Sequence, residues 1–204
     1  ENIIVKQYIN TWLPLGQDID GEAAGDLSGY SVSLSTDGTR VAIGAVGNGS
    51  YSGHVRVYDF IGTSWVQIGE DIDGEAAWDY SGDSVSLSAD GTRVAIGAYA
   101  NDDNGDRSGH VRVYDFIGTS WVQIGQDIDG EAEDDLSGGS VSLSANGKIV
   151  AIGAYNNNGV NGSGSGHVRV YELDGSTWIQ IGEDIDGDAV DDYSGWSVSL
   201  SADG

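Results

Sequence analysis

Short stretches of the chain alternate, residue by residue, between apolar and polar or small side chains. Valine and leucine alternate with serine in segment 84–88, and large apolar residues alternate with alanine or glycine in 94–97. In 110–114, two valines lie on the face opposite histidine, arginine and tyrosine. A period of two predicts β-strands, and no segment has the spacing of an amphipathic helix. With segment 65–68, these make four short strands per repeating unit.

The same pattern recurs along the chain. Each copy opens with a tryptophan and continues into Gly-x-Asp-Ile-Asp-Gly, which divides the chain into 12–64, 65–120, 121–177 and an incomplete 178–204. The copies differ in length in one place, so a variable loop is expected at 46–52, 99–108 and 155–165. Residues 1–204 are therefore predicted to form one repeat array. Segment 1–11 is predicted to be the outer strand of a preceding or closing blade.

The second face of the inner strands carries serine, alanine and glycine, where a solvated face would carry charged or long polar residues. Each sheet is therefore expected to pack between two neighbours. Turn sequences at 36–38, 89–92 and 145–147 predict tight hairpins, which disfavours a linear β-solenoid of parallel strands. Radially stacked, four-stranded antiparallel sheets are the blades of a β-propeller, so the predicted fold is all-β with about 3.75 blades.

Three stretches of the first repeat carry a family resemblance. Gly29–Val32, Val41–Ala45 and Gly53–Tyr58 resemble the FG-GAP repeat of integrin α-subunit propellers, in the microbial type that lacks the integrin calcium loop. The chain departs from that pattern where Leu27–Ser28 or Tyr80–Ser81 replaces Phe before Gly, and where the Pro of Gly-Ala-Pro is missing. The resemblance extends over essentially the whole chain. It implies a propeller, usually of seven blades, with an extracellular role in adhesion or ligand binding.

The strand count predicts fewer than four blades. Ile3–Tyr8 has the pattern of a lone outer strand, three full blades follow, and two strands of a fourth end the chain. Because unpaired sheet edges are costly, either the chain is a piece of a longer protein or copies self-associate through their open propeller edges. We favour the first alternative, and an intact mass distinguishes the two.

Charge and composition exclude several functions. The chain has 33 acidic and 8 basic residues, a net charge of −25, so a direct nucleic-acid partner is not expected. No apolar run approaches the length of a membrane span, so no membrane insertion is expected. Six tryptophans and ten tyrosines argue against disorder, which the charge alone would favour.

Much of the acidic charge recurs in one loop of each repeat. Carboxylates stand at the first, third, fifth and ninth positions of 71–79 and of its counterparts, a spacing that can present oxygen ligands to Ca²⁺. The alternative is a solvated loop whose carboxylates cap backbone N–H groups. The candidate calcium ligands are Asp18, Asp20, Glu22, Asp26, Asp71, Asp73, Glu75, Asp79, Asp127, Asp129, Glu131, Asp135, Asp184, Asp186, Asp188 and Asp192.

Other recurring residues favour structural roles. His54, His110 and His167 occupy one repeat position in separate blades, so packing or a rim ion pair is favoured over a shared metal site. The arginines and lysine after the hairpin turns are expected to pair with neighbouring acidic loops; they are Arg40, Arg93 and Lys148. The tryptophans that open the repeats are expected to pack between blades; they are Trp12, Trp65, Trp121 and Trp178.

Two tryptophans break the repeat and are the candidate ligand surface. Trp78 and Trp196 stand on loops where other copies have different residues, as expected of a sugar-binding platform. No nucleophile elbow, phosphate loop or zinc motif is present, which favours a non-enzyme. The expected function is an extracellular or cell-surface scaffold for adhesion or matrix assembly, with protein or glycan partners at the loop face. A lectin-like, carbohydrate-binding propeller module is the alternative.

Overall fold

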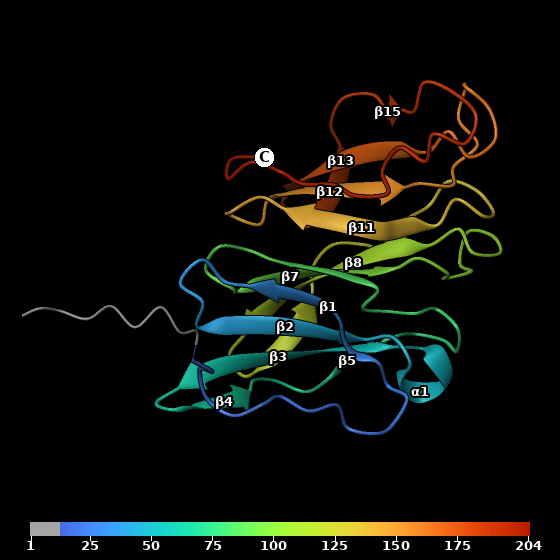
Figure 1. Cartoon of the computed structure of the whole chain (residues 1–204). Coiled ribbons are helices and arrows are strands. Elements are labelled where there is room, and N and C mark those ends of the chain that lie inside the picture. Colours follow the sequence, from blue (N-terminus) through green and yellow to red (C-terminus); the bar gives the residue numbers. More distant parts are fainter. Residues whose placement is uncertain (1–12) are drawn as a thin grey trace, which may run out of the picture.

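The computed structural model describes residues 13–204, which form three antiparallel sheets that follow one another along the chain (Figure 1). The predicted strand 1–11 and Trp12 lie outside these residues. The first sheet contains β1 (Ser28–Leu34), β2 (Arg40–Ala45), β3 (His54–Ile61), β4 (Ser64–Gln67) and the short β5 (Ile72–Asp73). The second contains β6 (Ser84–Leu87), β7 (Arg93–Ala98), β8 (His110–Ile117), β9 (Ser120–Gln123) and β10 (Ile128–Asp129). The third contains β11 (Ser137–Leu143), β12 (Ile149–Ala154), β13 (His167–Asp174), β14 (Thr177–Gln180) and β15 (Ile185–Asp186).

This arrangement confirms the all-β prediction of four-stranded antiparallel sheets. Each sheet has four consecutive strands, and the two-residue fifth strand pairs with the third, as β5 does with β3. A four-residue helix, α1 (Asn48–Tyr51), lies in the first variable loop at the right of Figure 1. No helix within residues 13–204 is long and apolar enough to cross a membrane.

The sheets begin one strand later than the sequence repeats. Trp65 opens a repeat in the sequence, yet its strand β4 pairs with β3 of the first sheet, with Trp65 opposite Phe60. The short turn between β3 and β4 makes this local pairing, so the tryptophan strand closes a sheet and does not open one. The two strands expected for a fourth blade are therefore a wrong prediction. One is β14 of the third sheet, and no strand follows β15 in the described chain.

The hairpin turns between the first two strands of each sheet form as predicted. Asp37 accepts hydrogen bonds from the backbone N–H of Thr39 at 3.0 Å and from the Ser35 hydroxyl at 2.7 Å. These bonds lower the pKa of Asp37 to about 2. Asp90 and Asn146 fill the same place in the next two turns. An Asx residue that binds its own turn holds the two strands at a fixed register.

Serine side chains join consecutive sheets. The hydroxyl of Ser31 donates to the Gly82 carbonyl at 2.6 Å, and that of Ser84 donates to the Gly138 carbonyl at 2.7 Å. The backbone N–H of Leu87 donates to the Ser33 hydroxyl at 2.9 Å. The serines that alternate with valine and leucine therefore face the next sheet. The expectation that small side chains allow close packing on both faces is confirmed for the second sheet, which lies between the other two.

Apolar residues of neighbouring sheets form the core between them. Ala42, Val55 and Val57 of the first sheet pack with Val94 and Ile96 of the second. Tryptophans add a hydrogen bond across each of these interfaces. The indole N–H of Trp121 donates to the Ile68 carbonyl, and Trp178 donates to Ile124, both at 3.1 Å. Trp178 is only 3% exposed, and Trp65 packs against the core beside the first sheet. The predicted packing role holds for the three tryptophans that the structure describes.

Candidate functional site

The ninth residue of each acidic loop stabilises its own loop. The side chains of Asp26, Asp79, Asp135 and Asp192 each accept a hydrogen bond from the backbone N–H three residues earlier, at 2.9, 3.0, 2.9 and 2.7 Å. The first three of these side chains are buried. A buried carboxylate that accepts backbone N–H bonds fixes a turn. The ninth residue of each loop therefore caps backbone N–H groups, which is the alternative to calcium binding given in the sequence analysis.

The first and fifth carboxylates of one loop go to different sheets. One oxygen of Asp71 accepts a hydrogen bond from the Gln67 amide at 2.7 Å, and the other lies 3.6 Å from Nδ1 of His54. Glu22, from the preceding loop, lies 3.9 Å from the same nitrogen. Each histidine thus meets the fifth residue of one loop and the first residue of the next.

The third carboxylate of each loop lies apart from these groups. Asp73 is exposed, and its backbone pairs with His54. Its carbonyl accepts a hydrogen bond from Arg112 at 2.8 Å, as the carbonyl of Asp20 does from Arg56. Within residues 13–204, none of the candidate metal-binding groups joins two carboxylates of a single loop. The exposed Asp18, Asp188 and Asp192, with Asp129 and Asp186, are in none of these groups.

Three histidine-centred groups result, and they are not equivalent. The first contains Glu22, His54 and Asp71, and the third contains Glu131, His167 and Asp184. The second contains Glu75, Asp103, His110 and Asp127, and so has a third carboxylate. Asp103 belongs to the second variable loop and was not among the residues that the loop pattern predicted. Its sequence signal is an aspartate pair, Asp102–Asp103, that the other two variable loops do not have.

Burial and a neighbouring arginine lower the imidazole pKa of His110 and His167. The His110 side chain is 1% exposed, and burial, followed by Arg112, lowers the pKa of its imidazole. The pKa of His167 is lowered chiefly by burial and then by Arg169. A neutral imidazole is therefore favoured in the fold, because the charged form would lose its hydration.

The arginines after the hairpin turns do not pair with the acidic loops. Arg40 forms two hydrogen bonds with Asp59 of its own sheet, at 2.5 and 2.8 Å, and Arg93 repeats this with Asp115. The expected pairing was wrong because the arginine and the aspartate face each other across β2 and β3. No ion pair involving Lys148 is found within residues 13–204.

The variable loops bring aromatic side chains together. Trp78 stacks on Tyr51 with ring centroids 4.8 Å apart, and Tyr80 stacks on Tyr99 at 5.4 Å. Trp196 lies 4.5 Å from Tyr155 by the same measure. Trp78 is 58% exposed and Trp196 is 66% exposed. Both candidate ligand-surface residues are thus part of exposed aromatic clusters.

A pocket of about 320 Å³ lies beside these clusters and is lined by Tyr30, Asp83, Tyr99, Gly139, Tyr155 and Trp196. Burial raises the pKa of Asp83 to about 6, although a hydrogen bond with Tyr30 opposes the shift. Four of the lining residues occupy one repeat position, directly after the glycine of a Ser-Gly step; they are Tyr30, Asp83, Gly139 and Trp196. That position holds a different residue in every copy, which is the sequence signal for this pocket.

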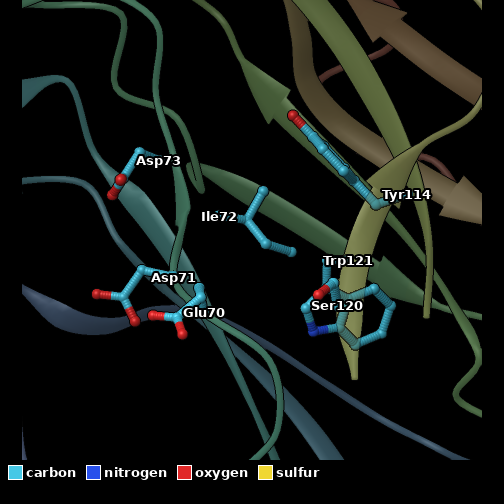
Figure 2. Close-up of a pocket in the computed structure, with 7 residues that line it drawn as sticks. All are labelled: Glu70, Asp71, Ile72, Asp73, Tyr114, Ser120 and Trp121. Atoms are coloured by element: carbon cyan, nitrogen blue, oxygen red, sulfur yellow. The ribbon is translucent and has the colours of Figure 1, made fainter. Parts of the chain in front are cut away.

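A second pocket, of about 250 Å³, opens between the first and second sheets (Figure 2). Figure 2 shows the carboxylates of Glu70, Asp71 and Asp73 on one side and the rings of Tyr114 and Trp121 on the other, with Ile72 between them. Trp121 donates a hydrogen bond to the Ile68 carbonyl across the interface, and Asp71 is bound to Gln67 within the first sheet, so these lining side chains already have partners. This pocket is a gap between packed sheets.

Comparison with known families confirms the resemblance in the second repeat. Residues 72–114 match the family model described as "FG-GAP repeat". These residues run from β5 of the first sheet to the middle of β8 in the second. No match was found among curated proteins.

The fold is that of β-propeller proteins. Candidate 6-phosphogluconolactonases of Bacteroides fragilis and Bacteroides uniformis match 80% and 78% of this chain, with TM-scores of 0.52 and 0.54 and 14% identity in both cases. The β-propeller domain of the Trilobed protease from Pyrococcus furiosus matches 76% of the chain at 13% identity and a TM-score of 0.48. The chain spans about 40% of the length of these structures. At such identity the likeness concerns the fold alone.

Proposed function

We propose that this chain is a non-enzymatic propeller segment that acts as an extracellular or cell-surface adhesion scaffold and contacts its partner through the variable-loop face. One observation carries the proposal: exposed aromatic residues from the loops of all three sheets gather at this face, around the pocket that contains Asp83. Exposed aromatic clusters with a polar centre are typical of binding surfaces. The opposite, hairpin-turn end of the sheets has the Asx turns and the Arg40 and Arg93 ion pairs instead.

A carbohydrate partner is the second candidate, and the pocket favours it. Tyr99, Tyr155 and Trp196 offer flat apolar faces, and Asp83 offers hydrogen-bond acceptors beside them. A sugar ring presents apolar C–H groups on its faces and hydroxyl groups at its edge, so this combination suits it. A protein partner would instead use the wider surface that includes Trp78 and Tyr51.

The charge of the chain supports a non-enzymatic role over that of its structural neighbours. The name 6-phosphogluconolactonase denotes a phosphorylated, anionic substrate, and such a substrate needs a cationic site. In the described part of the chain, the residues that line the pocket include a carboxylate and no basic side chain. Arg40, Arg93 and Arg169 are held by carboxylates elsewhere. Purified protein incubated with 6-phosphogluconolactone should give no hydrolysis above the spontaneous rate, and turnover would contradict this part of the proposal.

A glycan array compares the two binding candidates directly. The array is screened with the wild type and with Trp78→Ala, Trp196→Ala and Ile117→Ala; Ile117 is a matched control because it is 59% exposed at the opposite end of its sheet. Binding that is lost in Trp196→Ala and kept in Ile117→Ala supports the carbohydrate module. A silent array, with cell-surface or matrix-protein binding that Trp78→Ala weakens, supports the scaffold. If neither tryptophan affects any binding, the loop face is not the functional surface.

A further inference from the structure

We propose that Glu75, Asp103, His110 and Asp127 form a binding site for one divalent transition-metal ion of the zinc class. A ligand atom of each residue lies within 4.8 Å of those of the other three. Glu75 follows β5, Asp103 comes from the variable loop between β7 and β8, His110 begins β8, and Asp127 lies between β9 and β10. Folding therefore assembles the site from parts of the chain that are distant in sequence.

The imidazole of His110 is the observation that points to a ligand. Its Nδ1 atom is buried and has no hydrogen-bond partner within residues 13–204. It lies 3.8 Å from Oε2 of Glu75 and 4.0 Å from Oδ2 of Asp127, too far for hydrogen bonds. A buried polar atom left without a partner costs about 1–3 kcal/mol. A metal ion between these atoms would bind the nitrogen and both carboxylates together.

The spacing and the donor types suit zinc better than calcium. Ligand atoms at tetrahedral Zn²⁺ lie about 2.0–2.2 Å from the ion and hence about 3.4 Å from one another. The separations of His110 Nδ1 from Glu75 and from Asp127 exceed that value by a few tenths of an ångström, a distance that small rotations of the exposed Glu75 and the half-buried Asp127 side chains can close. One imidazole nitrogen and three carboxylates form a mixed set that borderline metals accept, whereas Ca²⁺ requires six to eight oxygens.

The charge around the histidine also favours a cation. Three carboxylates surround one imidazole in this group. The guanidinium of Arg112 lies 3.4 Å from Glu75, but another of its nitrogens donates to the Asp73 carbonyl at 2.8 Å. Arg112 therefore lies beside the group and does not bridge its carboxylates.

The other two repeats provide internal comparisons. At His167 the Nδ1 atom is also unpartnered, but Arg169 binds both carboxylates, Asp184 at 3.0 Å and Glu131 in close contact. The guanidinium already supplies the positive charge that a metal would bring. At His54 the residues within 13–204 that join the group are only Glu22 and Asp71, with no counterpart of Asp103. The second group is thus the one in which a metal ion is best accommodated.

Zinc titration of the full, tag-free chain tests the proposal. By isothermal calorimetry with Zn²⁺ alone, we expect one tight site per chain and an affinity at least about tenfold lower in both His110→Gln and Asp103→Asn. His167→Gln is the matched control, because it removes the equivalent imidazole from the arginine-bridged group, and it should leave the tight site unchanged. The proposal is overturned if the wild type shows no saturable site, or if His110→Gln binds as tightly as the wild type.

Two further measurements separate metal binding from folding and from calcium binding. Asp103 is exposed, so Asp103→Asn should keep the wild-type circular dichroism spectrum and thermal midpoint without metal. With zinc, the wild-type midpoint should rise and that of Asp103→Asn should rise less, because a ligand that binds the native state stabilises it. Millimolar Ca²⁺ should not displace the zinc. If Ca²⁺ does displace it, the site is a general oxygen-donor cation site and the zinc assignment fails.

Discussion

Gly97 of β7 lies against the carbonyl oxygen of Gly138 in the next sheet so closely that a Cβ on Gly97 would overlap that oxygen. The same contact occurs between Gly44 and Gly82, and between Gly153 and Gly195. The hydroxyl of Ser84 donates to the Gly138 carbonyl beside this contact. The glycine of each Ile-Gly-Ala segment is therefore required by the close approach of the next Ser-Gly step of the chain, and not by the backbone conformation of its own strand.

Replacing Gly97 should open this interface. Gly97→Ala is expected to destabilise the fold by about 1–3 kcal/mol, because the new methyl group must displace the backbone of the next sheet. Gly118→Asn is the control, since Gly118 has φ +67°, which Asn tolerates, and no neighbour within 4 Å. Urea unfolding measures both variants. Equal losses in the two variants would show that the contact with Gly138 is not the cause.

The interface between the second and third sheets has a pair of hydrogen bonds that the interface between the first and second sheets lacks within residues 13–204. The Gln126 side chain donates to the Trp178 carbonyl at 2.9 Å and accepts from the Trp178 backbone N–H at 3.2 Å. Glu70 stands at the equivalent place opposite Trp121, and a carboxylate cannot donate. Glu70→Gln should therefore raise the free energy of unfolding by about 0.5–1.5 kcal/mol.

The reverse change, Gln126→Glu, provides the matched control for Glu70→Gln. It should lower the unfolding free energy by a similar amount, and chemical denaturation at constant ionic strength compares the two. If both substitutions shift stability in the same direction, net charge and not this hydrogen-bond pair determines the effect.

Asp83 should make stability depend on pH. Burial raises its pKa to about 6 in the folded chain from 3.8. A carboxyl whose folded pKa is raised contributes most stability below pH 4, where it is protonated in both states, and this stability is lost as pH rises toward 6. Asp83→Asn removes the titration, so the variant should gain about 2 kcal/mol over the wild type at pH 7.

The difference between Asp83→Asn and the wild type, measured by denaturation at several pH values, is the informative quantity. It should be small at pH 4, grow between pH 4 and 6, and stay constant above pH 7. Taking the difference cancels the opposite trend from residues such as Asp37, whose pKa is lowered. A constant difference across the whole range would contradict the burial of Asp83 in this pocket.

Arg93 binds two sheets together. Its guanidinium donates twice to Asp115 and once to the Gly147 carbonyl of the next hairpin turn, at 2.8 Å. Arg93→Lys keeps the charge but cannot form this planar set of bonds, so a loss of about 1–2 kcal/mol is expected. Lys148→Ala, an exposed change in the next turn, should have little effect. Equal stability of Arg93→Lys and the wild type would show that charge alone is sufficient.

The sequence predicted the local structure well because its signals act over a few residues. Alternation of Val85 and Leu87 with serine identified a strand, and Asp90 in its turn identified the hairpin. The assignment of Trp65 to the start of a blade was wrong, because a sequence repeat does not show where one blade ends and the next begins. A repeat can be divided at any point, and only the pairing of Trp65 with Phe60 shows to which sheet the strand belongs.

The candidate sites are formed by contacts between residues far apart in the chain, and the sequence pattern does not predict these contacts. The pattern predicted Glu75 and Asp127 as candidate metal ligands and grouped each with the other carboxylates of its own loop. In the fold they meet at His110, together with Asp103 from a third segment. The pocket around Asp83 is similar, because Tyr30, Gly139 and Trp196 are far apart in sequence and meet only when the sheets stack.

By itself, the sequence determined the strands, the Asx turns, the repeat and the small side chains that let sheets pack closely, since these depend on backbone preferences and on hydrophobic alternation. The tertiary structure decided which sheet each tryptophan strand joins and which carboxylates face each histidine. The physical reason is that the two ends of one acidic loop are held by neighbouring sheets. Asp71 accepts a hydrogen bond from Gln67 of the first sheet, and Asp79 accepts one from Asn101, which follows β7 of the second. Carboxylates adjacent in sequence are thereby separated, and carboxylates a full repeat apart are brought together.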